Sequence, residues 1–258
     1  MILRISYMRY FRALLMSLGM FSTLLIPRNI WDDKLLPLML PCLPVTGAII
    51  GTLWYVIALL VRMADIPPLI QSAAAMLAPF ALCGFIHTDG YIDTADAIFS
   101  RASLDEKKRI LKDPRVGAFG AISLAVLFLL EFCATATIVL SKGNYCTLIF
   151  IPILSRCCAG AAMLNMKAMS DTGYAATFKA NSKLSHTVFI CVVGVLAAAT
   201  AWLFAGNIAI IVLIVEAIAG VLAMAWTYRQ FEGLSGDLCG FIITVGELAG
   251  ILCLAVLI

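Results

Sequence analysis

The sequence predicts an all-α fold, a polytopic bundle of transmembrane helices. Of its 258 residues, 63% are hydrophobic and 13% are charged, whereas soluble domains are about half apolar and about a quarter charged. Apolar stretches of about 20 residues, the length needed to cross a bilayer, recur along the whole chain. We therefore expect a single integral membrane domain over residues 1–258, with short cytoplasmic helices between the spans.

Seven apolar stretches are candidate spans. They cover residues 37–61, 66–86, 117–140, 145–166, 185–205, 207–228 and 238–258. The fifth and sixth are the least distinct pair, because almost nothing but Gly206 separates them. Before the first span, residues 13–26 are apolar but shorter than the roughly 20 residues that a span needs. We expect an N-terminal interfacial helix there, with a tilted extra span as the alternative.

Lysine and arginine are distributed unequally between the two sides of these spans. If the connections alternate sides, one side carries only Arg62 and Lys142, Arg156 lies within a span, and the remaining 15 of the 18 basic residues fall on the other side. Basic residues are retained in the cytoplasm. We therefore place the N-terminus and two long polar segments, residues 87–116 and 167–184, in the cytoplasm and the C-terminus outside.

The composition argues against two other classes of protein. The net charge is only +3, and the basic residues are scattered without interleaved aromatic residues, so we expect no nucleic-acid partner. The nine cysteines include no C-x-x-C pair and lie mostly in apolar runs, so we expect free thiols rather than a disulfide framework. A zinc site is disfavoured, because the chain has two histidines and no cysteine at ligand spacing.

The most informative segment is the acidic cluster HTDGYIDTADAIFS, residues 87–100, which begins where the second predicted span ends. On a helix, Asp89, Asp93 and Asp96 share one face, and no lysine or arginine in the segment balances their charge. Carboxylates that repel one another suit a hard cation such as Mg²⁺, which prefers a few carboxylates together with substrate phosphates. The alternative is a solvated helix end with capping aspartates.

Residues that flank the acidic cluster suggest phosphate binding. His87 admits three interpretations, as a metal ligand, a general base or an interfacial histidine bonded to the backbone, and the sequence leaves them open. Lys112, Asp113 and Arg115 place two cations and a carboxylate at the mouth of the third span. The cations would bind phosphate oxygens or simply anchor the span on the cytoplasmic side. The preceding residues predict an amphipathic helix with Leu111 facing the membrane.

Four ionisable residues fall inside predicted spans: Glu131, Arg156, Glu216 and Glu247. A charge at the bilayer centre costs about 2.5–3.5 kcal/mol on insertion scales, so such residues tend to mark function or a specific partner. Asp237, which follows several small residues at the mouth of the last span, either belongs to a ligand site or caps the helix.

Together these segments resemble the cobalamin synthase family, the adenosylcobinamide-GDP ribazoletransferases. Residues 84–100 are similar to the family's signature of glycine, histidine, D-G and D-x-x-D. Residues 112–120 resemble its K-D-S-x-x-G-x-x-G segment, and residues 233–240 its G-x-T-G-D-x-x-G motif. Arg156 and Glu247 match an intramembrane arginine and a later glutamate of the family. The similarity covers essentially the whole chain.

Three positions depart from the family pattern. Ala97 replaces a glycine, and Pro114 replaces a serine. Residues 23–27, TLLIP, lack the arginine of the family's T-R-I-P, so an N-terminal phosphate contact would depend on Arg28. The three aspartates of the acidic cluster are retained, and we therefore expect an active enzyme.

The resemblance implies a Mg²⁺-dependent phosphoryl transfer, the last assembly step of the vitamin B12 nucleotide loop. A hydroxyl of α-ribazole or its 5'-phosphate attacks the corrinoid-side phosphorus of adenosylcobinamide-GDP, and GMP leaves. The metal ligands would be Asp89, Asp93 and Asp96, and the catalytic residues His87, Asp89 and Asp93. The substrate-binding residues would be Lys112, Asp113, Arg115, Arg156, Asp237 and Glu247.

The resemblance also implies a place in a bacterial or archaeal cytoplasmic membrane, with the active site facing the cytoplasm. It leaves open a homo-oligomer or a complex with other enzymes of nucleotide-loop assembly. Two other functions are alternatives. A CDP-alcohol phosphotransferase carries D-G-x-x-A-R, but here no arginine follows the acidic cluster until Arg101. A transporter would concentrate its ionisable residues near the membrane midplane, whereas the acidic cluster is predicted at one interface.

Overall fold

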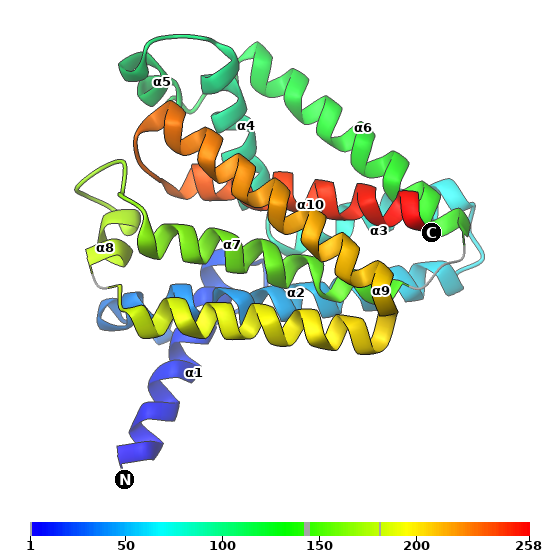
Figure 1. Cartoon of the computed structure of the whole chain (residues 1–258), viewed down its shortest axis with the longest axis horizontal. Helices are drawn as coiled ribbons and strands as arrows, with labels where there is room; N and C mark the ends of the chain where they lie inside the picture. Colours follow the sequence, from blue (N-terminus) through cyan, green and yellow to red (C-terminus); the bar gives the residue numbers. More distant parts are fainter. Residues whose placement is uncertain (1, 142–144, 181) are drawn as a thin grey trace.

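The computed structural model describes residues 2–141, 145–180 and 182–258, and in these ranges the chain is helical without extended strands. The α-helices are α1 (Ile2–Phe21), α2 (Leu36–Met63), α3 (Pro68–Leu82), α4 (Ile86–Phe99), α5 (Leu104–Ile110), α6 (Ala118–Ser141), α7 (Ile151–Asn165), α8 (Tyr174–Ala180), α9 (Leu184–Phe231) and α10 (Gly236–Leu257). Three short 3-10 helices are η1 (Arg28–Ile30), η2 (Asp33–Leu35) and η3 (Tyr145–Ile149). The all-α class is confirmed (Figure 1). None of the nine cysteines, all of which lie in the described ranges, forms a disulfide, as expected.

Several helices are long and apolar enough to cross a membrane. Within the described ranges, five segments qualify alone: Asp33–Met63, Ala118–Ser141, Tyr145–Asn165, Leu184–Phe231 and Gly236–Leu257. The bent pair α3 and α4 would make a sixth. The helix α9, with 48 residues, is counted as one span. A straight helix of that length would reach roughly 72 Å, over twice the thickness of the apolar layer of a bilayer. α9 instead reverses at Gly206 (φ 69°, ψ −157°), where the sequence predicted a division (Figure 1). The polytopic bundle is confirmed, and the number of seven spans stays a prediction.

The second predicted span, residues 66–86, ends earlier than expected. α3 stops at Leu82, and the chain then turns by 89° into α4. The turn uses positive φ at both Gly84 (61°) and Phe85 (59°). Glycine adopts this conformation readily, but it is uncommon for a bulky residue such as phenylalanine. The acidic cluster is therefore carried on a separate helix, nearly at right angles to α3.

α4 crosses the first turns of α10 with their main chains in close contact. A Cβ atom on Gly90 would lie 2.8 Å from the Cα atom of Asp237, and one on Gly240 would lie 2.9 Å from the His87 carbonyl oxygen. Only glycine permits such an approach. The Thr244 hydroxyl donates a hydrogen bond to the same His87 carbonyl at 3.3 Å. This crossing fixes the acidic cluster beside the start of the last helix.

The N-terminal helix α1 packs on α2 with its second half, where Ala13 and Met16 are buried. Its first residues extend away from the bundle (Figure 1). Arg12 ties the helix to the next segment by donating to the carbonyl oxygens of Ile30 and Trp31, at 2.5 and 3.1 Å. α1 is not among the helices that qualify as spans, and its interfacial placement stays a prediction.

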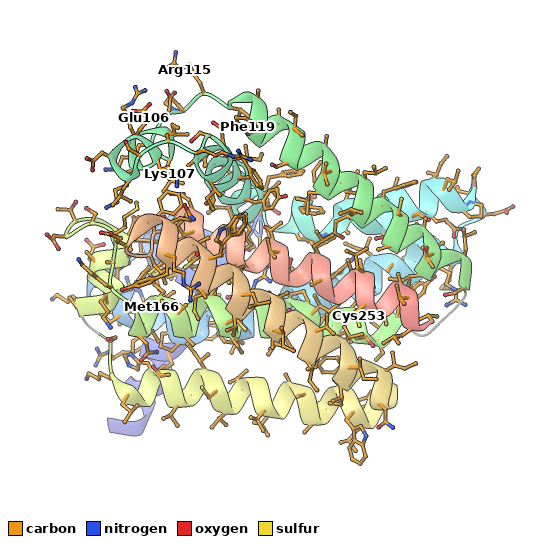
Figure 2. All side chains as sticks on the ribbon, turned by 45° about the horizontal axis from the view of Figure 1, so that its top comes forward. Glu106, Lys107, Arg115, Phe119, Met166 and Cys253 are labelled. Atoms are coloured by element: carbon orange, nitrogen blue, oxygen red, sulfur yellow. The ribbon has the colours of Figure 1, made fainter. Side chains whose placement is uncertain are left out.

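The polar segments gather at one end of the bundle. The connections around α5 and α8 and the turn between α9 and α10 lie at this end, whereas the point where α9 reverses and the C-terminus lie at the other (Figure 1). Figure 2 shows Glu106, Lys107 and Arg115 clustered on the α5 side and Cys253 at the opposite end. One end of the bundle therefore combines the acidic cluster with the long polar segments.

Replacing Gly51 with alanine should destabilise the bundle. The new Cβ would overlap the carbonyl oxygen of Ile149, a main-chain atom that cannot rotate aside. Overpacking of this kind costs about 1–3 kcal/mol, so the unfolding temperature in detergent should fall. Gly194→Ala is the matched control, because its methyl group would meet Cys157 Sγ at an ordinary 3.5 Å. Equal unfolding temperatures for the two variants would contradict the close helix packing.

Candidate active site

A cavity of about 440 Å³ lies beside the crossing of α4 and α10. Four predicted site residues line it: His87 and Asp89 from α4, Lys112 from the connection after α5, and Asp237 from α10. Its volume is within the range of roughly 300–1,000 Å³ that is typical of small-molecule pockets. The fold thus brings residues from three distant parts of the sequence around one space.

Part of the cavity wall comes from a segment to which the sequence assigned no chemistry. Three polar residues of the predicted cytoplasmic segment 167–184 line the cavity: Ser170, Thr172 and Tyr174. The Met169 amide donates to the Leu234 carbonyl at 2.8 Å, and the Leu234 amide donates to the Lys167 carbonyl at 2.9 Å. These bonds hold the segment against the turn before α10. Its unusual length between spans was the only signal in the sequence.

The carboxylates of α4 and α10 repel one another across the crossing. The charges of Asp89, Asp237 and Asp96 all act unfavourably on the Asp93 carboxylate. In the ranges that the structure describes, none of the ion pairs includes any of these four residues. Like charges that lack a basic partner favour a bound cation or a protonated carboxyl group.

The chemistry of these donors fits Mg²⁺, but the side chains do not form a ready ligand set. Aspartate oxygens are suitable ligands for a hard divalent ion. Among the described residues, no three His, Cys, Asp or Glu side chains are placed to hold a metal ion together. The metal role of Asp89, Asp93 and Asp96 stays a prediction.

Asp96 has a structural contact of its own. Its Oδ1 accepts a hydrogen bond from the Gly120 amide at 3.1 Å, in the first turn of α6. The carboxylate also lies against Gly117, where any Cβ atom would overlap it. Asp96 therefore caps the start of α6 from a neighbouring helix, a contact that the sequence did not predict.

His87 lines the cavity and has one buried ring nitrogen, Nε2, without a hydrogen-bond partner. The imidazole stacks on Phe21, with ring centroids 6.3 Å apart and planes inclined by 20°. The Nε2 atom is therefore not bonded to the backbone. The roles of metal ligand and general base both stay open.

The connection between α5 and α6 divides its residues between the cavity and solvent. Leu111 does not face the membrane as predicted, because it packs in the same apolar cluster as Leu234 and is only 4% exposed. Arg115 instead points outward, is 84% exposed and forms an ion pair with Asp113 at 2.8 Å. Hydrogen bonds from the Arg115 side chain and main chain lower the pKa of the Asp113 carboxyl to about 2. Neither residue of this pair lines the cavity, so their substrate contact stays a prediction.

Arg156 and Glu247 meet in the bundle interior, away from the cavity lining. Arg156 is 1% exposed and donates to Glu247 Oε1 at 2.5 Å. It also donates to Ser155 Oγ at 3.1 Å and to Cys83 Sγ at 3.2 Å. Glu216 is buried nearby, with both carboxyl oxygens unpartnered. The pair joins α7 to α10, and its predicted role in substrate binding is not tested by this contact.

Asp237 is not the helix cap considered from the sequence. The N-cap of α10 is Ser235, whose Oγ accepts from the Leu238 amide at 3.3 Å. The same hydroxyl donates to Asp237 Oδ2 at 3.3 Å. The capping interpretation of Asp237 is wrong, because the serine two residues earlier already fills that position. Its carboxylate lines the cavity instead.

Comparison with known proteins assigns a family to this arrangement. The sequence model of the family described as cobalamin-5-phosphate synthase matches residues 13–255. The chain belongs to this family. The resemblance of its motifs is thereby confirmed. The side chain of Arg28, the proposed substitute for the family's N-terminal arginine, lies outside the described residues.

Curated relatives in the cobalamin-5-phosphate synthase family carry the name adenosylcobinamide-GDP ribazoletransferase. The protein of Clostridium botulinum (strain Alaska E43 / Type E3) is 32% identical over 241 residues, which cover 93% of this chain and 96% of the relative. That of Clostridium perfringens (strain ATCC 13124) is 30% identical over 248 residues, covering 96% and 99%. That of Geobacillus kaustophilus (strain HTA426) is 31% identical over 245 residues, covering 90% and 91%. No solved structure matches the chain.

Two substitutions of Asp96 should test whether this residue caps α6. Asp96→Ala removes the acceptor for the Gly120 amide, and loss of such a cap costs about 0.5–2 kcal/mol. We expect a lower unfolding temperature in detergent for this variant. Asp96→Asn keeps an acceptor oxygen and should unfold close to the wild type. An alanine variant as stable as the wild type would contradict the capping role.

Proposed function

We propose that this chain joins adenosylcobinamide-GDP to α-ribazole or α-ribazole 5'-phosphate, with release of GMP and formation of adenosylcobalamin or its 5'-phosphate. The observation that carries the proposal is the gathering of His87, Asp89, Lys112 and Asp237 around one cavity. The family and the shared name of its relatives support it, since they point to the same nucleotide-loop assembly step.

The proposed reaction exchanges one phosphorus–oxygen bond for another. A ribose hydroxyl oxygen bonds to the corrinoid-side phosphorus, and the bond from that phosphorus to the bridging oxygen breaks, so GMP leaves with this oxygen. The hydroxyl proton needs an acceptor within hydrogen-bond reach. His87 is our candidate, because its Nε2 is unpaired beside the cavity. The Lys112 ammonium group would bind diphosphate oxygens and hold the two substrates in position.

Asp89, Asp93 and Asp96 are the residues that we propose to hold Mg²⁺. The ion, when bound, would offset the charge of the diphosphate oxygens during transfer. The uncompensated repulsion on Asp93 supports this assignment. Because Asp96 also caps α6, we expect Asp89 and Asp93 to contribute more to the metal site than Asp96.

Neutralising Asp89 or Asp93 should remove most Mg²⁺-dependent turnover while leaving the protein inserted. Loss of a ligand should lower kcat/KM by about 100-fold or more, since even residues that only orient ligands contribute about 10–100-fold. The measurement is release of GMP and formation of the corrinoid product in membrane vesicles, with adenosylcobinamide-GDP, α-ribazole and varied Mg²⁺. Asp105→Asn, on the exposed face of α5, is the matched control. Full activity in both Asp89→Asn and Asp93→Asn would refute the metal assignment.

We also propose a cytoplasmic (inner) membrane location with the cavity facing the cytoplasm. The end of the bundle that holds the cavity also holds α5, α8 and their basic connections, and basic segments are retained on the cytoplasmic side.

A protease site inserted into the exposed turn between Arg101 and Ser103 should report the orientation. We expect cleavage in inverted membrane vesicles and protection in intact spheroplasts, because the turn lies at the basic end of the bundle. Activity of the uncut insertion variant controls for folding. Cleavage in spheroplasts alone would reverse the assigned orientation.

A further inference from the structure

The cavity has an apolar wall whose occupant the proposed reaction does not specify. We use the name apolar wall for Leu40, Leu43, Met163, Ala175 and Phe178, which line the cavity and belong to one core cluster. Four of them are nearly excluded from solvent, at 4%, 4%, 5% and 4% exposure for Leu40, Leu43, Met163 and Phe178. The same cavity is lined by two carboxylates and the Lys112 ammonium group. It can therefore bind a ligand that is apolar on one side and charged on the other.

We propose that the apolar wall binds the flat bicyclic base of α-ribazole and leaves its ribose directed toward His87 and Asp89. This inference rests on the proposed function, and it assigns the nucleoside, rather than the corrinoid, to the apolar wall of the cavity. The diphosphate of the second substrate then meets the ribose at the charged residues, where the transfer would take place.

The chemistry of the substrates distinguishes their groups. Guanine and adenine carry several hydrogen-bonding groups, and enclosing them against apolar side chains would leave these groups unpaired at a free-energy cost. A corrin ring with its amide side chains is also much larger than the nucleoside and exceeds a cavity of about 440 Å³. The base of α-ribazole has methyl groups and a single free ring nitrogen, so burial costs it little. It is the substrate group that matches the apolar wall.

Aromatic residues lie both at the apolar wall and beside the charged residues of the cavity. Tyr174 stacks on Phe178, with ring centroids 6.2 Å apart and planes inclined by 24°. The Phe21 and His87 rings are stacked in a similar way at 6.3 Å. Flat rings are favourable partners for an aromatic base. The proposal also gives a function to α8, whose residues the phosphoryl transfer does not use.

A larger side chain on the apolar wall should weaken the binding of α-ribazole but not that of adenosylcobinamide-GDP. Ala175→Leu adds a bulky side chain at the cavity, whereas Ala176→Leu makes the same change at the next position of α8, which does not line it. One extra methylene in an apolar pocket changes discrimination by about 10–200-fold. We therefore expect the KM for α-ribazole to rise by about tenfold or more in Ala175→Leu. The KM for adenosylcobinamide-GDP should stay within about twofold, and Ala176→Leu should change neither constant.

A second variant keeps the test decisive if Ala175→Leu does not fold. Met163→Ala enlarges the same wall, so it should lower the KM for an α-ribazole analogue with a larger, tricyclic base relative to that for α-ribazole. A rise in the KM for adenosylcobinamide-GDP alone in Ala175→Leu, or no change in base preference in Met163→Ala, would overturn the assignment of the base. A wild-type protein that forms no corrinoid product at all would instead overturn the proposed function.

Discussion

The contact between the main chains of α4 and α10 determines where the chemistry of this protein can occur. Gly90 and Gly240 have no side chains to separate the helices, so the Asp237 backbone and the His87 carbonyl occupy the space that their Cβ atoms would need. The acidic cluster on α4 and Asp237 on α10 come from distant parts of the chain, and this crossing brings them together. Without it, Asp89 and Asp237 would belong to separate surfaces instead of one cavity.

The two groups of charges in the bundle differ in how they are balanced. Arg156 and Glu247 neutralise each other in the interior, and removing either partner would leave an unpaired buried charge. The carboxylates around Asp93 have no such partner within the described ranges and repel one another. The interior pair therefore balances its charge within the protein, although Arg156 Nε is buried without a hydrogen-bond partner. The carboxylates around Asp93 are better suited to a state with a bound cation. The balanced pair needs no ion from outside to offset its charge, and its predicted role in substrate binding stays a prediction.

The sequence predicted those features that depend on local pattern. Hydropathy identified the helical class, and the break at Gly206 followed from the single glycine between two apolar runs. It did not reveal the turn at Phe85, because the surrounding residues are apolar and a positive φ is uncommon for phenylalanine. It missed the cap that Asp96 provides for α6, since that bond joins separate helices. Likewise, the cavity wall formed by residues 170–174 depends on pairing with Leu234, which no local pattern encodes.

That pairing has a consequence for how substrates enter and leave. Two main-chain hydrogen bonds, between Leu234 and the residues Lys167 and Met169, hold the segment after α7 to the turn before α10, and Met169 also packs on the apolar cluster that contains Leu234. Each such bond contributes a net of about 0.5–1.5 kcal/mol, so we expect the two loops to separate at a lower free-energy cost than the long packed helices. The glycine crossing, in contrast, is buried within packed helices and would stay closed during such motion. If the cavity opens for ligand exchange, we therefore expect it to open at these loops, while the reacting groups keep their positions.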